Sequence, residues 1–93
     1  MNCQFITEAK VIKEPMYQAD ASSKNRHLKT GLISSHKNTP LMACMRKCRE
    51  SNKNCKSFSY HDDHTCHLHD VKRREVEREN FVEKEGSTYY EEL

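Results

Sequence analysis

The clearest pattern of apolar and polar positions begins at Thr39-Pro40, in the middle of the chain. The apolar residues that follow are three or four positions apart and so share one stripe of an α-helix: Leu41, Cys44, Met45 and Cys48. Thr is a favoured N-cap, and Pro is favoured at the first helical position, where its missing N–H is no loss. The pattern therefore predicts a helix of about three turns that directs both cysteines toward a core and ends in a turn over 51–54.

A β-hairpin is predicted directly after this helix. The segment Lys56–Tyr60 (KSFSY) is typical of a strand, 61–65 (HDDHT) of a polar turn, and Cys66–His69 (CHLH) of a returning strand. On the returning strand, Cys66 and Leu68 share one face. A turn centred between the two aspartates would place Cys66 opposite Ser59.

The amino-terminal third of the chain predicts two further strands. Within Cys3–Ile12 the odd positions share one face and are apolar apart from Thr7, which indicates a strand that ends before Pro15. The polar run Asp20–Asn25 is typical of a loop. A second short strand is expected over His27–Ser34, interrupted by Gly31.

The carboxy-terminal part has a weaker pattern. The stretch Val71–Glu85 is mostly charged, with Val76, Phe81 and Val82 as its apolar points. After Gly86, the run Ser87–Tyr90 predicts a closing strand.

The amino-acid composition indicates that a fold of this chain needs support beyond its apolar core. Ninety-three residues form one domain, 1–93, and only 34% of them are hydrophobic while 32% are charged, so an apolar core alone gives little stability. Five cysteines at this density form a disulfide framework in a secreted chain or bind metal in a cytosolic one. No segment approaches the roughly 20 consecutive apolar residues of a membrane span. The first ten residues lack the features of a signal peptide, so a secreted form would have had its signal removed.

The helix and hairpin rank the possible cysteine pairings. Cys44 and Cys48 lie one helical turn apart with nearly parallel Cβ directions, so a bridge between them would distort the helix. If the hairpin runs back antiparallel along the helix, Cys55 lies beside Cys48 and Cys66 lies nearer Cys44. This geometry favours the nested pairs Cys44–Cys66 and Cys48–Cys55, each contributing about 2 to 4 kcal/mol.

The spacing of these segments resembles the PAN/apple domain family. The chain carries Cys44-MRK-Cys48, Cys55-KSFSY, Cys66-HLHD and Gly86-STYYE. These runs are similar to the family's Cys-x-x-x-Cys helix, Cys-x-Ser-Phe-x-Tyr strand, Cys-x-Leu strand and late Gly-x-x-Tyr-Tyr. The resemblance is close over Cys44–Tyr90 and looser over Phe5–Glu92.

The resemblance implies an α+β fold, with one α-helix packed on an antiparallel β-sheet of about five strands and stapled by the same nested disulfides. We expect five side chains to form the core between helix and sheet: Phe58, Leu68, Leu41, Met45 and one of Tyr89 or Tyr90. Apple domains often carry a third bridge joining the two ends. Cys3 has no such partner here, and we expect it to pair beyond Leu93 in a longer parent, rather than with another chain or not at all.

Charge is unevenly distributed along the chain. The net charge is +2, yet residues 1–56 carry 11 basic and 4 acidic side chains (+7), whereas 57–93 carry 5 and 10 (−5). A basic set on or near the outer helix face is a candidate for binding sulfated glycans or acidic protein surfaces: Arg46, Lys47, Arg49, Lys53 and Lys56. Lys72-Arg73-Arg74 is a second cluster, and the glutamates after it favour local neutralisation.

A zinc site is the main alternative. The hairpin segment 61–69 holds His61, His64, Cys66, His67 and His69. Three further cysteines have the right chemistry to complete such a site: Cys44, Cys48 and Cys55. The paired spacings typical of structural zinc sites do not occur, however. We therefore expect solvent-facing histidines on a hairpin, with no metal and no cofactor.

Catalysis and nucleic-acid binding are poorly supported. Cys66 beside His64 or His67 is only a superficial nucleophile–base pair, and the two glycines offer no phosphate-binding loop or nucleophile elbow. The aromatic residues are expected in the core rather than on a stacking platform. The sequence therefore predicts a non-catalytic extracellular recognition or adhesion module of a larger secreted or cell-surface protein. It would bind a protein or glycan ligand, without membrane insertion; the alternative is a small cytosolic zinc-binding domain that uses the Cys/His cluster.

Overall fold

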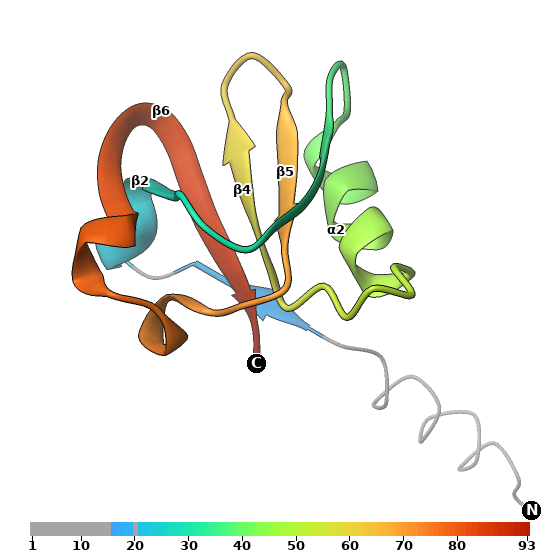
Figure 1. The fold of residues 1–93 in the computed structure, drawn as a ribbon. Helices are drawn as coiled ribbons and strands as arrows, with labels where there is room; N and C mark the ends of the chain where they lie inside the picture. The colour runs from blue at the N-terminus through green and yellow to red at the C-terminus, as the bar shows by residue number, and fades with distance from the viewer. Residues whose placement is uncertain (1–15, 20) are drawn as a thin grey trace, which may run out of the picture.

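One helix packs on a sheet of antiparallel strands in the computed structural model, which describes residues 16–19 and 21–93 (Figure 1). The predicted strand Cys3–Ile12, together with Cys3 itself and Asp20, lies outside the described residues. The elements follow in chain order: β1 Tyr17–Gln18, the 3₁₀ turn η1 Ala21–Ser23, β2 Lys24–Leu28, β3 Leu32–His36, α2 Leu41–Arg49, β4 Ser57–His61, β5 Cys66–His69, the 3₁₀ turns η2 Arg73–Glu75 and η3 Arg78–Asn80, and β6 Phe81–Glu92.

The sheet has six strands in the order β1-β6-β4-β5-β3, with β2 also paired to β6. β6 pairs with β4 along one edge, where Phe58 lies opposite Tyr90. Its other edge pairs with β1 near the carboxyl end and with β2 along the amino-terminal half. The expected closing strand over Ser87–Tyr90 is thus the centre of a longer strand. β6 starts six residues earlier, within the mostly charged stretch Val71–Glu85.

The single strand predicted over His27–Ser34 is two strands with different partners. β2 pairs with β6, whereas β3 pairs with β5. Gly31, at a φ of 72°, lies in the link between them, and a Cβ placed on it would come within 2.6 Å of Val71. The loop predicted over 20–25 is also shorter than expected, because β2 already begins at Lys24.

The predicted helix is present as α2, but its cap differs from the expectation. Pro40, in extended conformation, is the N-cap, and its carbonyl accepts the first helical hydrogen bond from the Cys44 N–H at 2.9 Å. The Thr39 hydroxyl instead donates to the Lys37 carbonyl at 3.0 Å. The prediction that Thr39 caps the helix was therefore wrong, because its side chain stabilises the preceding turn.

The predicted hairpin is present as β4 and β5, one residue out of the expected register. Cys66 lies opposite Tyr60 rather than Ser59. The physical reason is the turn: His61 and Thr65 still pair through their backbones, and His64 adopts a left-handed φ of 68°. A three-residue loop ending in a left-handed residue is a common hairpin connection.

The core between helix and sheet forms around Phe58, which is fully buried. Tyr90 stacks on its ring at 4.9 Å and Tyr17 meets it edge-on at 5.5 Å. Leu68 is buried beside it, and Leu41 and Met45 pack against the cluster from α2. The expected core is present, with Tyr90 as the tyrosine on the helix side; Tyr89 is buried on the opposite face.

Two disulfides link α2 to the segments after it. Cys44 bonds to Cys66 with a Cα–Cα distance of 5.6 Å, and Cys48 bonds to Cys55 with a Cα–Cα distance of 5.1 Å. This is the nested arrangement expected from the helix stripe. All four sulfurs lie in the core cluster.

Candidate functional site

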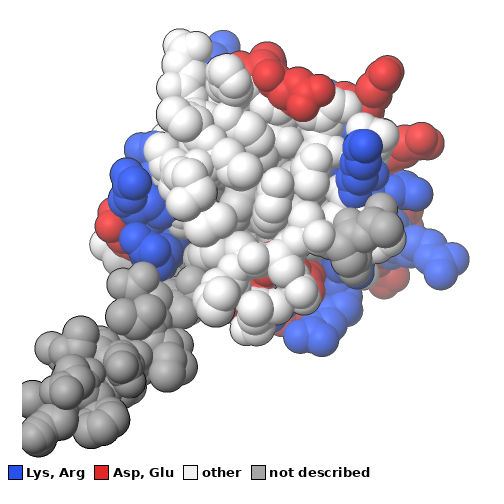
Figure 2. Space-filling model, turned by 180° about the vertical axis from the view of Figure 1, so that it is seen from behind, with Lys and Arg blue, Asp and Glu red and all other residues white. Residues whose placement is uncertain are grey.

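Of the five basic residues proposed from the sequence, two line one groove together: Lys47 and Lys53. Arg46 and Lys47 are exposed on α2, and basic side chains gather along the left edge of Figure 2, where α2 lies in the turned view. Successive helical residues differ in direction by about 100°, so Lys47 and Arg49 point to opposite flanks of the helix. Arg49 acts electrostatically on Tyr17, beside β6, whereas Lys47 faces β3.

Lys56 forms an ion pair with Glu75. Its ammonium lies 3.5 Å from the Glu75 carboxylate, and both side chains are partly exposed. This contact links η2 to the residue before β4. Lys56 is therefore better explained as a local structural contact than as a ligand-binding cation.

Lys47 and Lys53 come together at a shallow groove between α2 and β3. The groove has a volume of about 360 Å³, and its lining combines apolar, polar and charged side chains: Ile33, Ser34, His36, Lys47, Glu50, Ser51, Asn52, Lys53 and Leu68. The Ser34 hydroxyl and His36 Nε2 are hydrogen-bonded at 2.9 Å along its β3 side. Two ammonium groups against one carboxylate give this groove a net charge of +1.

The second basic cluster, Lys72-Arg73-Arg74, is built into a loop. The Arg73 guanidinium donates to the Ser22 hydroxyl at 2.7 Å and lies 5.4 Å from the centre of the Phe81 ring. Its backbone N–H donates to the Tyr89 hydroxyl at 2.9 Å. At least Arg73 therefore has a structural role in joining the loop to β6 and η1.

A polar layer covers the sheet face opposite the helix. Ser57, Ser59, His69 and Ser87 are all buried there, and Tyr89 lies among them. Ser59 and His69 are hydrogen-bonded at 3.1 Å, and the Ser57 hydroxyl donates to the Val71 carbonyl at 2.6 Å. The serine hydroxyls and His69 Nε2 find partners within the fold, as buried polar groups normally do, whereas His69 Nδ1 is buried without one among the described residues.

The histidines of the hairpin are not the solvent-facing side chains that we expected. His61 and His69 are buried and His67 is half-buried, while His64 in the turn is exposed. The cause is β2, which brings His27 over this face of the sheet: its ring centre lies 5.3 Å from that of His61 and 5.4 Å from that of His67. The rings of His61 and His67 are 4.7 Å apart.

Burial holds these imidazoles in their neutral form. Loss of hydration lowers the pKa of His27 to about 4, with help from the neighbouring histidines, and lowers the pKa of His69 to about 4 in the same way. Burial also lowers the pKa values of His61 and His67, and the Lys84 ammonium adds to both effects. At neutral pH the ring nitrogens are therefore uncharged.

The disulfides exclude two alternatives considered from the sequence. A zinc site made with these cysteines needs thiolates, and a cysteine nucleophile does too, but Cys44, Cys48, Cys55 and Cys66 are all in disulfides. The cytosolic zinc domain built on the Cys/His cluster is therefore ruled out. Cys66 beside His67 is no catalytic pair.

Comparison with protein families decides what kind of module this is. The family model described as "PAN domain" matches residues 19–92, which is most of the chain. The chain belongs to the PAN domain family. The resemblance noted from the sequence is thereby confirmed, and the single helix, the antiparallel sheet and the two disulfides agree with it.

Family membership gives the general role of this PAN domain. PAN domains are disulfide-rich modules, typically of extracellular proteins, that mediate protein or carbohydrate interactions and are generally non-catalytic. No curated protein and no solved structure matches the chain in the other two comparisons. Among the described residues of the PAN domain, no helix is long and apolar enough to cross a membrane.

Sequence reasoning missed His27 as a possible site residue of this PAN domain. His27 is 34 positions before His61 and stands between a basic and an apolar residue, without a spacing motif. Only the pairing of His27 with Val82 on β6 brings it to the hairpin. Local spacing does not reveal that a residue lies on a strand whose partner strand is far along the chain.

Proposed function

We propose that this PAN domain is a non-catalytic extracellular recognition module that binds a sulfated glycan at the groove between α2 and β3. The observation that supports this proposal is the groove itself, where Lys47 and Lys53 flank the polar Ser34–His36 pair. Ammonium groups beside hydroxyl, amide and imidazole groups offer charge-assisted and neutral hydrogen bonds to sulfate and sugar hydroxyls. Ile33 and Leu68 provide apolar surface for a sugar ring.

The proposal keeps three residues of the five-residue basic set expected from the sequence. Lys47 and Lys53 carry the proposed contact, and exposed Arg46 extends the positive surface on α2. Lys56 is left out of the proposed binding site because its ammonium pairs with the Glu75 carboxylate. Glu50 lines the same groove and opposes anions, so we expect modest affinity that depends on salt.

Retention on a sulfated polysaccharide resin tests the proposal. We expect the parent domain to bind at low ionic strength and to elute as salt rises, because surface charges are screened within about 8 Å at physiological ionic strength. The variant Lys47→Glu with Lys53→Glu should elute at distinctly lower salt. Its melting temperature should stay nearly unchanged, because exposed substitutions seldom cost more than about 0.5 kcal/mol.

A charge-matched control separates a site from net charge. Lys24→Glu with Lys29→Glu changes the charge by the same amount at exposed positions of β2 and the link after it. Chelator in all buffers removes any contribution of metal ions. If the control variant loses retention as much as the groove variant, the groove is an ordinary solvated surface and the proposal is wrong.

A further inference from the structure

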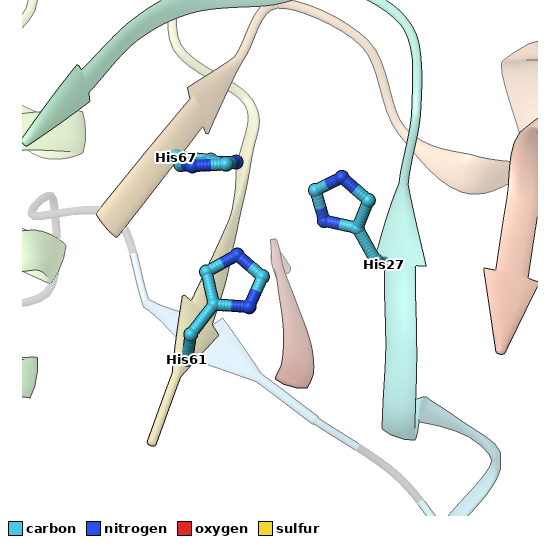
Figure 3. Close-up of side chains that lie close together, drawn as sticks. All are labelled: His27, His61 and His67. Atoms are coloured by element: carbon cyan, nitrogen blue, oxygen red, sulfur yellow. The ribbon is translucent and has the colours of Figure 1, made fainter. Parts of the chain in front are cut away.

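Three histidines from three strands point into one space in Figure 3: His27 on β2, His61 on β4 and His67 on β5. Each offers a ring nitrogen, and these three nitrogens all lie within 4.8 Å of one another. No sequence spacing links the three residues. The fold alone makes the cluster.

The hydrogen bonding of this cluster is incomplete. Among the described residues, neither nitrogen of His61 has a hydrogen-bond partner, and His61 is only 7% exposed. Nδ1 of His27 is buried and equally without a partner. Leaving a buried polar atom unpaired costs about 1 to 3 kcal/mol, so such nitrogens facing one another indicate a missing ligand.

We propose that His27, His61 and His67 together bind one divalent transition-metal ion, with Zn²⁺ as the expected ion. Imidazole nitrogen is a preferred ligand of zinc, copper and nickel, whereas calcium and magnesium prefer oxygen. This site uses no cysteine ligand, so it is compatible with an oxidised, extracellular domain. It departs from the sequence-based expectation of no metal.

The geometry requires only a small adjustment. Three nitrogens around one tetrahedral zinc at about 2.0 to 2.1 Å stand about 3.4 Å apart, so the rings must close by up to roughly 1.4 Å. Rotation of the His67 and His27 side chains can provide this, since both are only half-buried.

Acidic side chains lie beside the cluster together with the Lys84 ammonium, which opposes a cation at the histidines. His61 and His67 line a hollow of about 570 Å³ whose rim carries Asp62, Asp63 and Glu85 against a single ammonium, that of Lys84. The net charge of this rim is therefore −2. Because His61 and His67 line this hollow, we expect water or a rim carboxylate to supply the fourth ligand.

Zinc titration of the chelator-treated, tag-free chain tests the site. We expect one equivalent to bind with a micromolar or lower Kd, and calcium to compete negligibly. At free zinc of 100 times Kd, the melting temperature should rise by roughly 10 to 20 °C. No saturable zinc binding up to 100-fold above micromolar concentrations, or equal binding of calcium, would overturn the proposal.

Two single variants and one control identify the ligands. His27→Gln and His67→Gln should each weaken zinc binding by at least about 100-fold, since even groups that only orient metal-bound histidines are worth about 10- to 100-fold. His64→Asn removes an exposed imidazole from the same hairpin, and Asn tolerates the left-handed backbone found there. This control should bind zinc like the parent; an equal loss in all three variants contradicts the assignment.

A measurement on the parent protein tests the site even if the variants fail to fold. The ring-nitrogen NMR resonances of His27, His61 and His67 should shift together on adding one equivalent of zinc, while those of His36 and His64 stay in place. Shifts confined to His36 or His64 would place the ion elsewhere. In that case the proposed site does not exist.

Discussion

The Tyr89 hydroxyl shows how one buried polar group can tie distant segments together. It accepts a hydrogen bond from the Arg73 N–H at 2.9 Å and donates one to the Glu91 carboxylate at 2.9 Å. The ring is fully buried against Phe81, whose centre lies 5.0 Å away. Burial therefore raises the pKa of Tyr89 above its ordinary value of 10.0.

This pKa shift predicts a loss of stability at alkaline pH. The folded state keeps the Tyr89 proton above pH 10, where the unfolded chain releases it, so the stabilisation is present below pH 10 and declines as pH rises further. We expect the urea midpoint to fall more steeply above pH 10 in the parent than in Tyr89→Phe, which cannot ionise there. Equal slopes for the two proteins would show that Tyr89 ionises normally in the folded state.

Individual residues were predictable where burial follows a local period. The stripe on α2 correctly indicated that Cys44 and Cys48 are buried, because every contact that buries them lies on one helix face. The burial of His61 and His69 was not predictable in this way. Their environment depends on β2, which is contributed by a segment more than 30 residues earlier in the chain.

Among the elements, Gly31 separates β2 from β3, which the sequence pattern predicted as one strand interrupted at this glycine. Its φ of 72° lies in the left-handed region, and a Cβ would approach Val71 Cγ2 to 2.6 Å and Asp70 Oδ1 to 2.9 Å. The Asp70 N–H also donates to the Gly31 carbonyl at 2.9 Å, which fixes the backbone at this point. Any side chain here must strain the backbone and displace its neighbours.

We therefore expect Gly31→Ala to destabilise the domain by about 1 to 3 kcal/mol. About 1 kcal/mol comes from the left-handed backbone, and the rest from displacing Val71. Chemical denaturation measures the change, with Lys29→Ala at an exposed neighbouring position as the control for the link. A stability within about 0.5 kcal/mol of the parent would mean that the link is free to rearrange.

The elements were predictable to different degrees for a physical reason. α2 and the β4–β5 hairpin are stabilised by contacts close in sequence, so their periods were visible. The helix cap and the hairpin register were missed, the latter through one left-handed residue. β6 is different, because its amino-terminal half, Phe81–Gly86, is held by β2 from the other end of the chain. Its charged residues face solvent and hide the strand pattern.

At the scale of the whole molecule, the core depends on its sulfur atoms. Of the eight buried hydrophobic residues of the described chain, four are the disulfide cysteines. The remaining four are Leu28, Phe58, Leu68 and Tyr89, and two of them lie on the sheet face away from the helix. The two bridges therefore supply a large share of the buried apolar contact, beside the packing of Leu41 and Met45 on the Phe58 cluster.

Complete reduction should consequently abolish the cooperative fold. In the chain-entropy model, loops of 22 and 7 residues contribute about 3 and 2 kcal/mol, against a net stability of about 5 to 14 kcal/mol for a chain of this size. Reduced sulfur atoms must also move apart to van der Waals distance inside a core that has no spare volume. We expect the near-ultraviolet circular dichroism signal and the thermal transition to disappear when a phosphine reductant is added without chelator or metal. A reduced chain that still melts cooperatively would show that the sheet and its polar layer are sufficient without the bridges, and that the sulfur-centred core is not what holds the helix.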